Sequence, residues 1–200
     1  MTQAVLAMHA AMCAALGAWS GVQREKVSLG FGPRIVGFTR GGTEYALGCI
    51  PLGSSVKFET ESYWAAPRSR RIVIPGIVLA VVFGLGIPLA GGLEETVLAV
   101  RSFALGTIHP GEGVQELARF GRNVSEDPIG TFGVVLVCMG AFSALPLHGL
   151  DGGSILLTVT GAADSEKLSR GREIYAWVSL LVLLTIVGVW IYVAIRALAA

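Results

Sequence analysis

Four side chains in this sequence could bind a metal ion, and all four stand in apolar or small-residue stretches. His9 and Cys13 lie near the N-terminus, four residues apart. Asp151 is the only acid between residues 128 and 163, and His148 precedes it by three positions. A carboxylate at membrane depth costs a few kcal/mol or more, so such a residue is retained for a purpose and has a partner. These four residues are therefore the candidate functional group.

The chemistry of this group points to zinc, although other interpretations remain open. On a helix, residues four apart project from one face about one turn apart, as a two-ligand metal clamp requires. Imidazole and thiolate both suit zinc, with Asp151 as a candidate third ligand and His148 as a candidate fourth. Without metal, His9 would be a buried histidine bonded to a helix carbonyl. Asp151 would then cap a helix or pair with a histidine, and His148 would bond Asp151 or reach the interface.

The composition places these residues in an integral membrane protein. Of 200 residues, 53% are hydrophobic and 14% charged, whereas soluble domains are about a quarter charged. The net charge of +1 gives no indication of nucleic-acid binding. We expect one α-helical membrane domain over residues 1–200, in the bacterial inner membrane, with a small membrane-associated β-hairpin segment between the first two helices. Four apolar runs predict transmembrane helices, at about 2–23, 72–93, 129–147 and 175–195.

The connecting segments differ in character. Residues at about 27–60 alternate and are rich in Gly and β-formers, which predicts short strands and hairpins at the membrane surface, because open strand edges do not face lipid. Residues at about 94–128 read as a polar extracytoplasmic loop with a short amphipathic helix at 113–122. The apolar stretch after Asp151 is too short to span again and is expected to continue the third segment as a bent or half-height helix. Eight Lys or Arg in the 24–71 segment predict that it is cytoplasmic, with both termini outside.

Three blocks of the sequence resemble the site-2 proteases, which are intramembrane zinc metalloproteases. Their first helix carries H-E-x-x-H, and His9-Ala-Ala-Met-Cys13 stands at that place, before a segment beginning Val27-Ser-Leu-Gly-Phe-Gly. The second block, Gly42-Thr-Glu-Tyr-Ala-Leu-Gly-Cys-Ile-Pro-Leu-Gly-Ser-Ser-Val-Lys-Phe, looks like the family's membrane-dipping hairpin. The third, Ser143-Ala-Leu-Pro-Leu-His-Gly-Leu-Asp151-Gly-Gly, is similar to N-x-x-P-x-P-x-L-D-G-G. The resemblance implies zinc as the cofactor, His9, Cys13 and Asp151 as ligands, and substrate binding by Ser143, Gly48, Ile50 and Leu52.

Four departures from the family pattern put hydrolysis in doubt. Ala10 stands where the family's Glu activates the zinc-bound water, so the general-base position is vacant. Positioned acid–base groups contribute about 10²–10⁴-fold to such reactions. Cys13 replaces the second His of the motif, Ser143 replaces an Asn, and His148 replaces a Pro.

Three functions are consistent with this pattern. The first is a pseudoprotease that binds a transmembrane helix or extended peptide, alone or as a subunit of a larger membrane complex. The second is an active zinc protease with an altered site, or a chain whose catalytic Glu has been removed at position 10. The third is a metal-free helix bundle in which the polar residues form a buried hydrogen-bond network. Metal content and cleavage assays separate the three.

Overall fold

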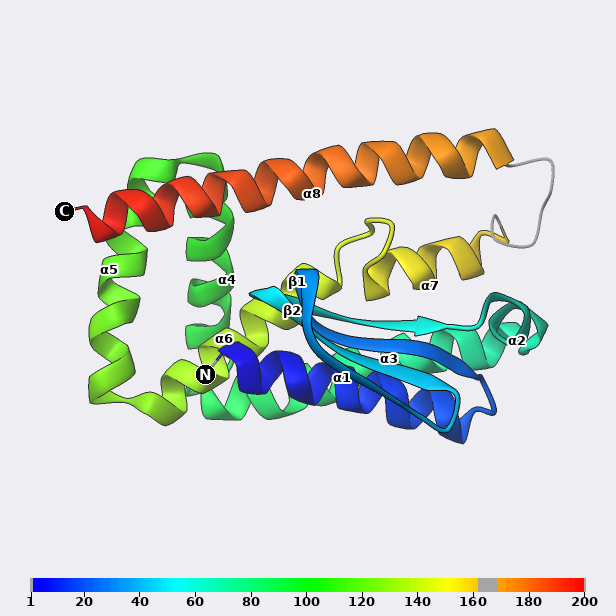
Figure 1. Ribbon diagram of the computed structural model, residues 1–200. Helices are drawn as coiled ribbons and strands as arrows, with labels where there is room; N and C mark the ends of the chain where they lie inside the picture. Colours follow the sequence, from blue (N-terminus) through cyan, green and yellow to red (C-terminus); the bar gives the residue numbers. More distant parts are fainter. Residues whose placement is uncertain (1, 162–168, 200) are drawn as a thin grey trace. The chain divides into compact units, whose positions relative to one another are not determined.

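The structure is a computed structural model that describes residues 2–161 and 169–199, and Figure 1 shows that it is mostly helical with one small sheet. The chain forms two compact units. Unit 1 comprises Met1–Ala80 and Ser154–Asp164, and unit 2 comprises Val81–Gly153 and Ser165–Ala200. We describe each unit by itself. The single domain expected over residues 1–200 stays a prediction.

Unit 1 begins with the apolar helix α1, Thr2–Trp19. The helix ends at a Schellman motif, in which Gly21 has a φ of 73° and the amides of Gly21 and Val22 bond the carbonyls of Ala18 and Gly17. Arg70 donates to the Ser20 carbonyl at 2.9 Å, which places positive charge at the negative end of the helix. The helix therefore stops before residue 23, the end expected from the apolar run.

A β-hairpin follows α1, which confirms the expected β segment, although its strands are longer than the short strands predicted. Strand β1, Arg24–Arg40, pairs antiparallel with β2, Thr43–Phe58. Gly41 and Gly42 form the turn with φ angles of 58° and 79°, a conformation that glycine adopts without strain. Residues 26–29 of β1 pair both with residues 54–57 and with residues 44–47, so the hairpin folds back on itself.

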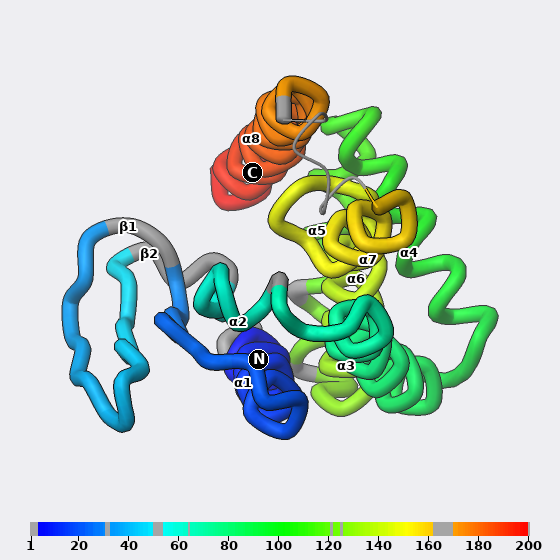
Figure 2. Tube along the Cα trace, turned by 90° about the vertical axis from the view of Figure 1, so that its right-hand side faces the viewer, coloured from blue at the N-terminus to red at the C-terminus, as the bar shows by residue number. Residues whose placement is uncertain are grey.

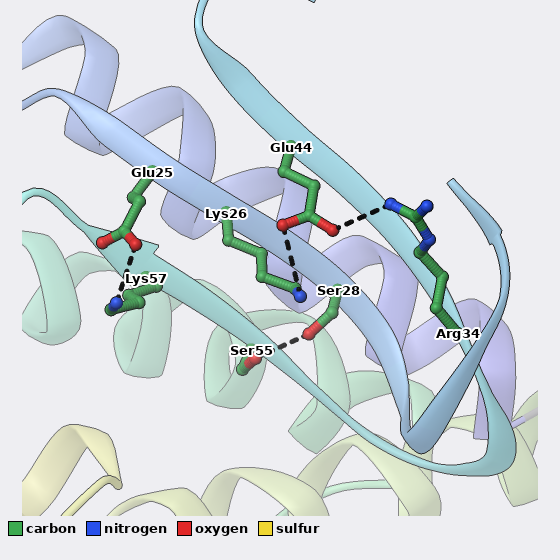
Figure 3. Close-up of polar contacts among 7 residues, drawn as sticks. All are labelled: Glu25, Lys26, Ser28, Arg34, Glu44, Ser55 and Lys57. Atoms are coloured by element: carbon green, nitrogen blue, oxygen red, sulfur yellow. Dashed lines mark hydrogen bonds and ion pairs between the residues drawn. The ribbon is translucent and has the colours of Figure 1, made fainter. Parts of the chain in front are cut away.

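Polar cross-strand contacts fix the register of this hairpin (Figure 3). Lys57 bonds Glu25 at 2.8 Å, and the hydroxyls of Ser28 and Ser55 lie 2.7 Å apart. The Glu44 carboxylate forms ion pairs with the Lys26 ammonium at 3.3 Å and with the Arg34 guanidinium at 3.2 Å. Such pairs each stabilise a sheet by about 0.2–1 kcal/mol.

The hairpin lies beside α1 in both views of the chain (Figures 1 and 2). The Phe58 ring occupies the space over Gly17, where a Cβ atom would collide with it. The short helix α2, Thr60–Ala65, then leads to α3, Arg68–Leu89, which continues into unit 2. Helix α3 ends at a second Schellman motif, because Gly91 and Gly92 have φ angles of 97° and 115° and bond the carbonyls of Pro88 and Ile87. This stop explains why α3 ends before residue 93.

The segment predicted to be a polar loop at 94–128 is instead two helices of unit 2. Helix α4 spans Leu93–Ile108, with Glu94 and Glu95 at its positive N-terminal end. Helix α5 spans Pro110–Glu126, and proline suits its first turn because the missing N–H would have no partner there. Gly106 and Gly113 let the two helices approach closely, since a Cβ atom on Gly106 would lie 3.0 Å from the Gly113 Cα. The expected helix at 113–122 is thus the middle of α5.

Three further helices follow between residues 128 and 198. Helix α6, Pro128–Ser143, is capped by the preceding Asp127, whose side chain accepts a hydrogen bond from the Gly130 amide at 2.9 Å. After the turn at residues 144–150 comes α7, Asp151–Val159, a separate short helix. Helix α8, Ser169–Leu198, extends beyond the apolar run at both ends. Its Trp190 stacks on Phe103 of α4 at 5.0 Å between ring centroids.

Within the described residues, two helices are long and apolar enough to cross a membrane, namely α3 and the Arg170–Leu198 part of α8. Helices α1 and α6 are apolar but shorter, with apolar stretches at Ala4–Trp19 and Pro128–Ser143. A helix that spans the hydrocarbon core perpendicular to the bilayer needs about 20 residues. Two of the four expected helices thus have the length and composition of a membrane span, and the expectation of four transmembrane helices stays a prediction.

Candidate metal centre

The His9 and Cys13 side chains meet on one face of α1 in unit 1. The His9 Nδ1 atom lies 4.0 Å from the Cys13 Sγ atom. Nitrogen and sulfur ligands at about 2.1 and 2.3 Å from one tetrahedral zinc ion lie roughly 3.6 Å apart. The pair therefore needs only a small adjustment to chelate such an ion. His9 is half-buried and Cys13 is buried.

The burial pattern of α1 explains why this pair faces inward. Leu6, Ala10, Cys13 and Gly17 are buried and recur at intervals of three or four residues, which places them on one helical face. His9 lies at the border of that face. Helix α1 has no acidic residue in its sequence, and Ala10 presents only a methyl group with 2% of its surface exposed. The helix thus offers two candidate metal ligands and no carboxylate.

Asp151 is the first residue of α7 and belongs to unit 2. The loop of residues 144–150 precedes it, with Gly149 at a φ of +88°. Gly152 and Gly153 lie against this loop: added Cβ atoms would collide with the carbonyls of Ala144 and Leu147, respectively. The two glycines therefore let the loop run directly over the start of α7, which fixes where the Asp151 backbone lies relative to the loop.

His148 is exposed and does not stand alone in this loop. Its ring meets the Tyr175 ring edge-on, with 6.0 Å between the centroids and 88° between the planes. The Tyr175 hydroxyl donates to the Pro146 carbonyl at 2.8 Å. Sequence reasoning missed Tyr175, because it is separated from the loop by more than twenty residues and stands in an ordinary apolar helix.

The residues predicted to bind substrate lie in both units. Ser143 is the last residue of α6 and is buried. Gly48 is half-buried in β2, where it pairs with Arg34. Ile50 and Leu52 belong to β2, but their side chains lie outside the described part of the structure. Since His9 and Cys13 belong to unit 1 and Asp151 to unit 2, a single three-ligand site stays a prediction.

A comparison with known families shows which family this chain belongs to. The profile of Peptidase family M50 matches residues 3–187. The chain belongs to this family, the site-2 proteases. Site-2 proteases are membrane-embedded, which agrees with the two apolar helices α3 and α8. The match covers α1, the hairpin and α7, so it includes every candidate ligand.

Individual relatives match over much shorter segments. A Bartonella henselae protein, provisionally named zinc metalloprotease BH06270, is 46% identical over 55 residues, which are 27% of this chain and 15% of that protein. The Agrobacterium fabrum protein Atu1380, named likewise, is 48% identical over 44 residues, which are 22% of this chain and 12% of the relative. A Brucella suis protein of the same name type is 51% identical over 41 residues, 20% of this chain and 11% of the relative. The chain therefore aligns with only a small part of the length of these relatives.

Proposed function

We propose that this M50 family member is a pseudoprotease, a membrane-embedded protein that binds a membrane peptide or protein segment without hydrolysing it. The observation that carries the proposal is Ala10. It is buried beside His9 on a helix without a carboxylate, at the position where the family pattern has its general base. A methyl group can neither accept a proton from water nor deliver one to a leaving amine.

We further propose that His9, Cys13 and Asp151 bind a zinc ion. Each residue offers a ligand atom of a kind that zinc accepts in proteins, and the separation of the His9 and Cys13 ligand atoms supports chelation by α1. Bound zinc would lower the pKa of a coordinated water and polarise a carbonyl. Cys13 would be bound as a thiolate, which leaves less positive charge on the ion than a neutral histidine would. Both the missing base and the thiolate therefore work against hydrolysis.

The hairpin supports binding of an extended peptide. Apolar side chains are exposed at its outer half, namely Ile35, Val36, Phe38 and Leu47, of which Ile35 is 62% exposed. Strand edges bind peptides through main-chain hydrogen bonds, with side-chain contacts providing selectivity. A membrane protein segment beside this hairpin would fit both the exposed apolar surface and the bilayer setting. A role as a subunit of a larger membrane complex belongs to the same proposal.

Metal analysis together with a cleavage assay tests the proposal. The full chain is purified in detergent, incubated with zinc, desalted and analysed for bound metal, in parallel with Asp151→Ala. We expect about one zinc ion per wild-type chain, none on the variant, and no cleavage of a panel of transmembrane peptides by either protein. Zinc-dependent cleavage that Asp151→Ala abolishes would instead establish an active protease with an altered site. If the wild type binds no zinc, the metal-free helix bundle would be the supported interpretation.

Binding must also be tested directly, because absence of cleavage alone does not define a pseudoprotease. The same peptide panel is screened in detergent by fluorescence anisotropy against the wild type and against Phe38→Asp, which places a charge in the exposed apolar part of the hairpin. We expect at least one peptide to bind the wild type and to bind the variant more weakly. Asp127→Asn serves as a control because Asp127 caps α6 and lies in unit 2. If no peptide binds, the binding role is wrong.

A further inference from the structure

Tyr175 connects α8 to the loop that leads into Asp151. Its hydroxyl donates to the Pro146 carbonyl at 2.8 Å, and its ring meets the His148 ring edge-on. A Cβ atom on Gly153 would also lie 2.9 Å from the Tyr175 hydroxyl. All of these residues belong to unit 2. One tyrosine thus contacts the loop on either side of Leu147 and reaches the first turn of α7.

The backbone of this loop needs such a contact. Residues 144–150 lie outside the helices on either side, and the third apolar run extends to about residue 147. Within a bilayer, non-helical backbone is tolerated only where protein or water satisfies its polar groups. The amides of Leu145, Leu147 and Leu150 bond to carbonyls of Phe142, Leu145 and Leu147, respectively. The Pro146 carbonyl receives its hydrogen bond from outside the loop, from α8.

The surroundings of Tyr175 distinguish it from an aromatic residue that only anchors a helix at the membrane surface. Such residues are enriched at the interface, where their polar ends contact water and headgroups. Tyr192 fits that description, since it lies on the same helix with 52% of its surface exposed. Tyr175 is half-buried and directs its hydroxyl to a main-chain carbonyl of its own unit.

We propose that Tyr175 is a positioning residue, which holds the 144–150 loop and thereby orients the Asp151 carboxylate for metal binding. The loop and α7 pack closely through Gly152 and Gly153, so movement of the loop is transmitted to Asp151. The part of this inference that concerns zinc rests on the function proposed above. The part that concerns the loop stands on the contacts of Tyr175 alone.

The test compares Tyr175→Phe, which removes only the hydroxyl, with the matched variant Tyr192→Phe on the same helix. Zinc affinity of the full-length protein in detergent is measured by competition with a chelating dye, using zinc alone as the ligand. Residues that orient metal ligands change affinity by about 10–100-fold, and we expect Tyr175→Phe to weaken zinc binding by about tenfold. Tyr192→Phe should bind zinc as the wild type does. Unchanged affinity in Tyr175→Phe would overturn the role in metal binding.

Hydrogen–deuterium exchange of the metal-free proteins provides a second readout. We expect faster amide exchange at residues 144–153 in Tyr175→Phe, with exchange in α4 and α5 unchanged, and no effect of Tyr192→Phe. A general loss of structure would instead accelerate exchange throughout unit 2, which would contradict a positioning role. If the wild type binds no zinc, the metal proposal fails, and exchange alone decides whether Tyr175 holds the loop. Unchanged exchange at 144–153 would then overturn this inference too.

Discussion

At the scale of single residues, α1 carries two candidate metal ligands and an alanine at the position of the family's general base. His9 and Cys13 lie at a separation that suits a shared ion, whereas the residue between them that could have completed a catalytic motif is a buried alanine. The candidate ligands of α1 and the position of the family's general base are therefore different residues of one helix.

The first prediction concerns His9. Outer-shell partners of metal ligands alone change affinity by about 10–100-fold, so loss of a direct ligand in His9→Ala is expected to weaken zinc binding by roughly 100-fold or more. His109→Ala is the control, because His109 lies at the junction of α4 and α5 and has no expected role in binding. Equilibrium dialysis with zinc measures both variants. Equal zinc affinity of His9→Ala and wild type would show that His9 is a structural residue.

The second prediction concerns His148, which decides whether a bound zinc ion is structural or keeps an open position. A four-ligand shell of His9, Cys13, Asp151 and His148 would leave no position for water or substrate. The exposed His148 ring already contacts Tyr175, so we expect His148→Ala to keep its zinc content and thermal stability. Metal analysis and thermal unfolding with and without zinc check this. Loss of zinc together with a clear drop in stability would indicate a closed, structural site.

At the scale of secondary-structure elements, glycines determine where the helices end and how closely they pack. Gly21 ends α1, Gly91 and Gly92 end α3, and Gly152 and Gly153 allow the 144–150 loop to cover the start of α7. Gly21, Gly91 and Gly92 have positive φ angles, which glycine adopts without strain. At Gly152 and Gly153, glycine is needed because a Cβ atom would collide with the loop. Substitutions at the two kinds of position therefore act through different physical causes.

The third prediction tests the close packing at α7. In Gly153→Ala the new Cβ atom would collide with the Leu147 carbonyl, and overpacking of this kind costs about 1–3 kcal/mol. We expect a decrease of that size in the free energy of unfolding, together with weaker zinc binding. The control is Gly188→Ala in α8, where a Cβ atom would meet no atom within 4 Å. Alanine in a helix interior is favoured over glycine by about 0.5–1 kcal/mol, so this variant should be as stable as wild type or more so. Unfolding of both variants in mixed micelles by SDS titration gives the comparison.

At the scale of the whole molecule, orientation in the membrane follows from the distribution of basic residues. Eight Lys or Arg lie in residues 24–71, and loops with such an excess remain cytoplasmic. The hairpin is therefore expected on the cytoplasmic side, and α4 and α5 on the other. This arrangement would present the hairpin to partners from the cytoplasm.

The fourth prediction tests this orientation by labelling single cysteines in a background without the three native ones. Thr39→Cys, near the exposed turn of the hairpin, should react with a membrane-impermeant maleimide only after the cells are opened. Ala118→Cys, on an exposed position of α5, should react in intact cells. Labelling of Thr39→Cys from outside the cell would reverse the proposed topology.

The sequence by itself determined the class of protein, the family and the candidate ligands. These depend on local properties: long apolar runs, the i, i+4 spacing of His9 and Cys13, and the short motif around Asp151. The β segment between the first two apolar helices was likewise predictable from its alternating pattern. The family match over residues 3–187 confirms that these local motifs were sufficient to predict the family.

Only the tertiary structure decided the features that depend on contacts between distant residues. The 94–128 segment was predicted to be a polar loop because it carries three basic and several acidic residues, whereas close contact at Gly106 and Gly113 pairs two helices there. The hydrogen bond from Tyr175 of α8 to Pro146 in the loop before Asp151 joins residues that are far apart in the sequence. No local sequence pattern predicts such a contact. Periodicity and spacing record what each segment does alone, but a hydrogen bond or a close approach between segments depends on how the chain folds.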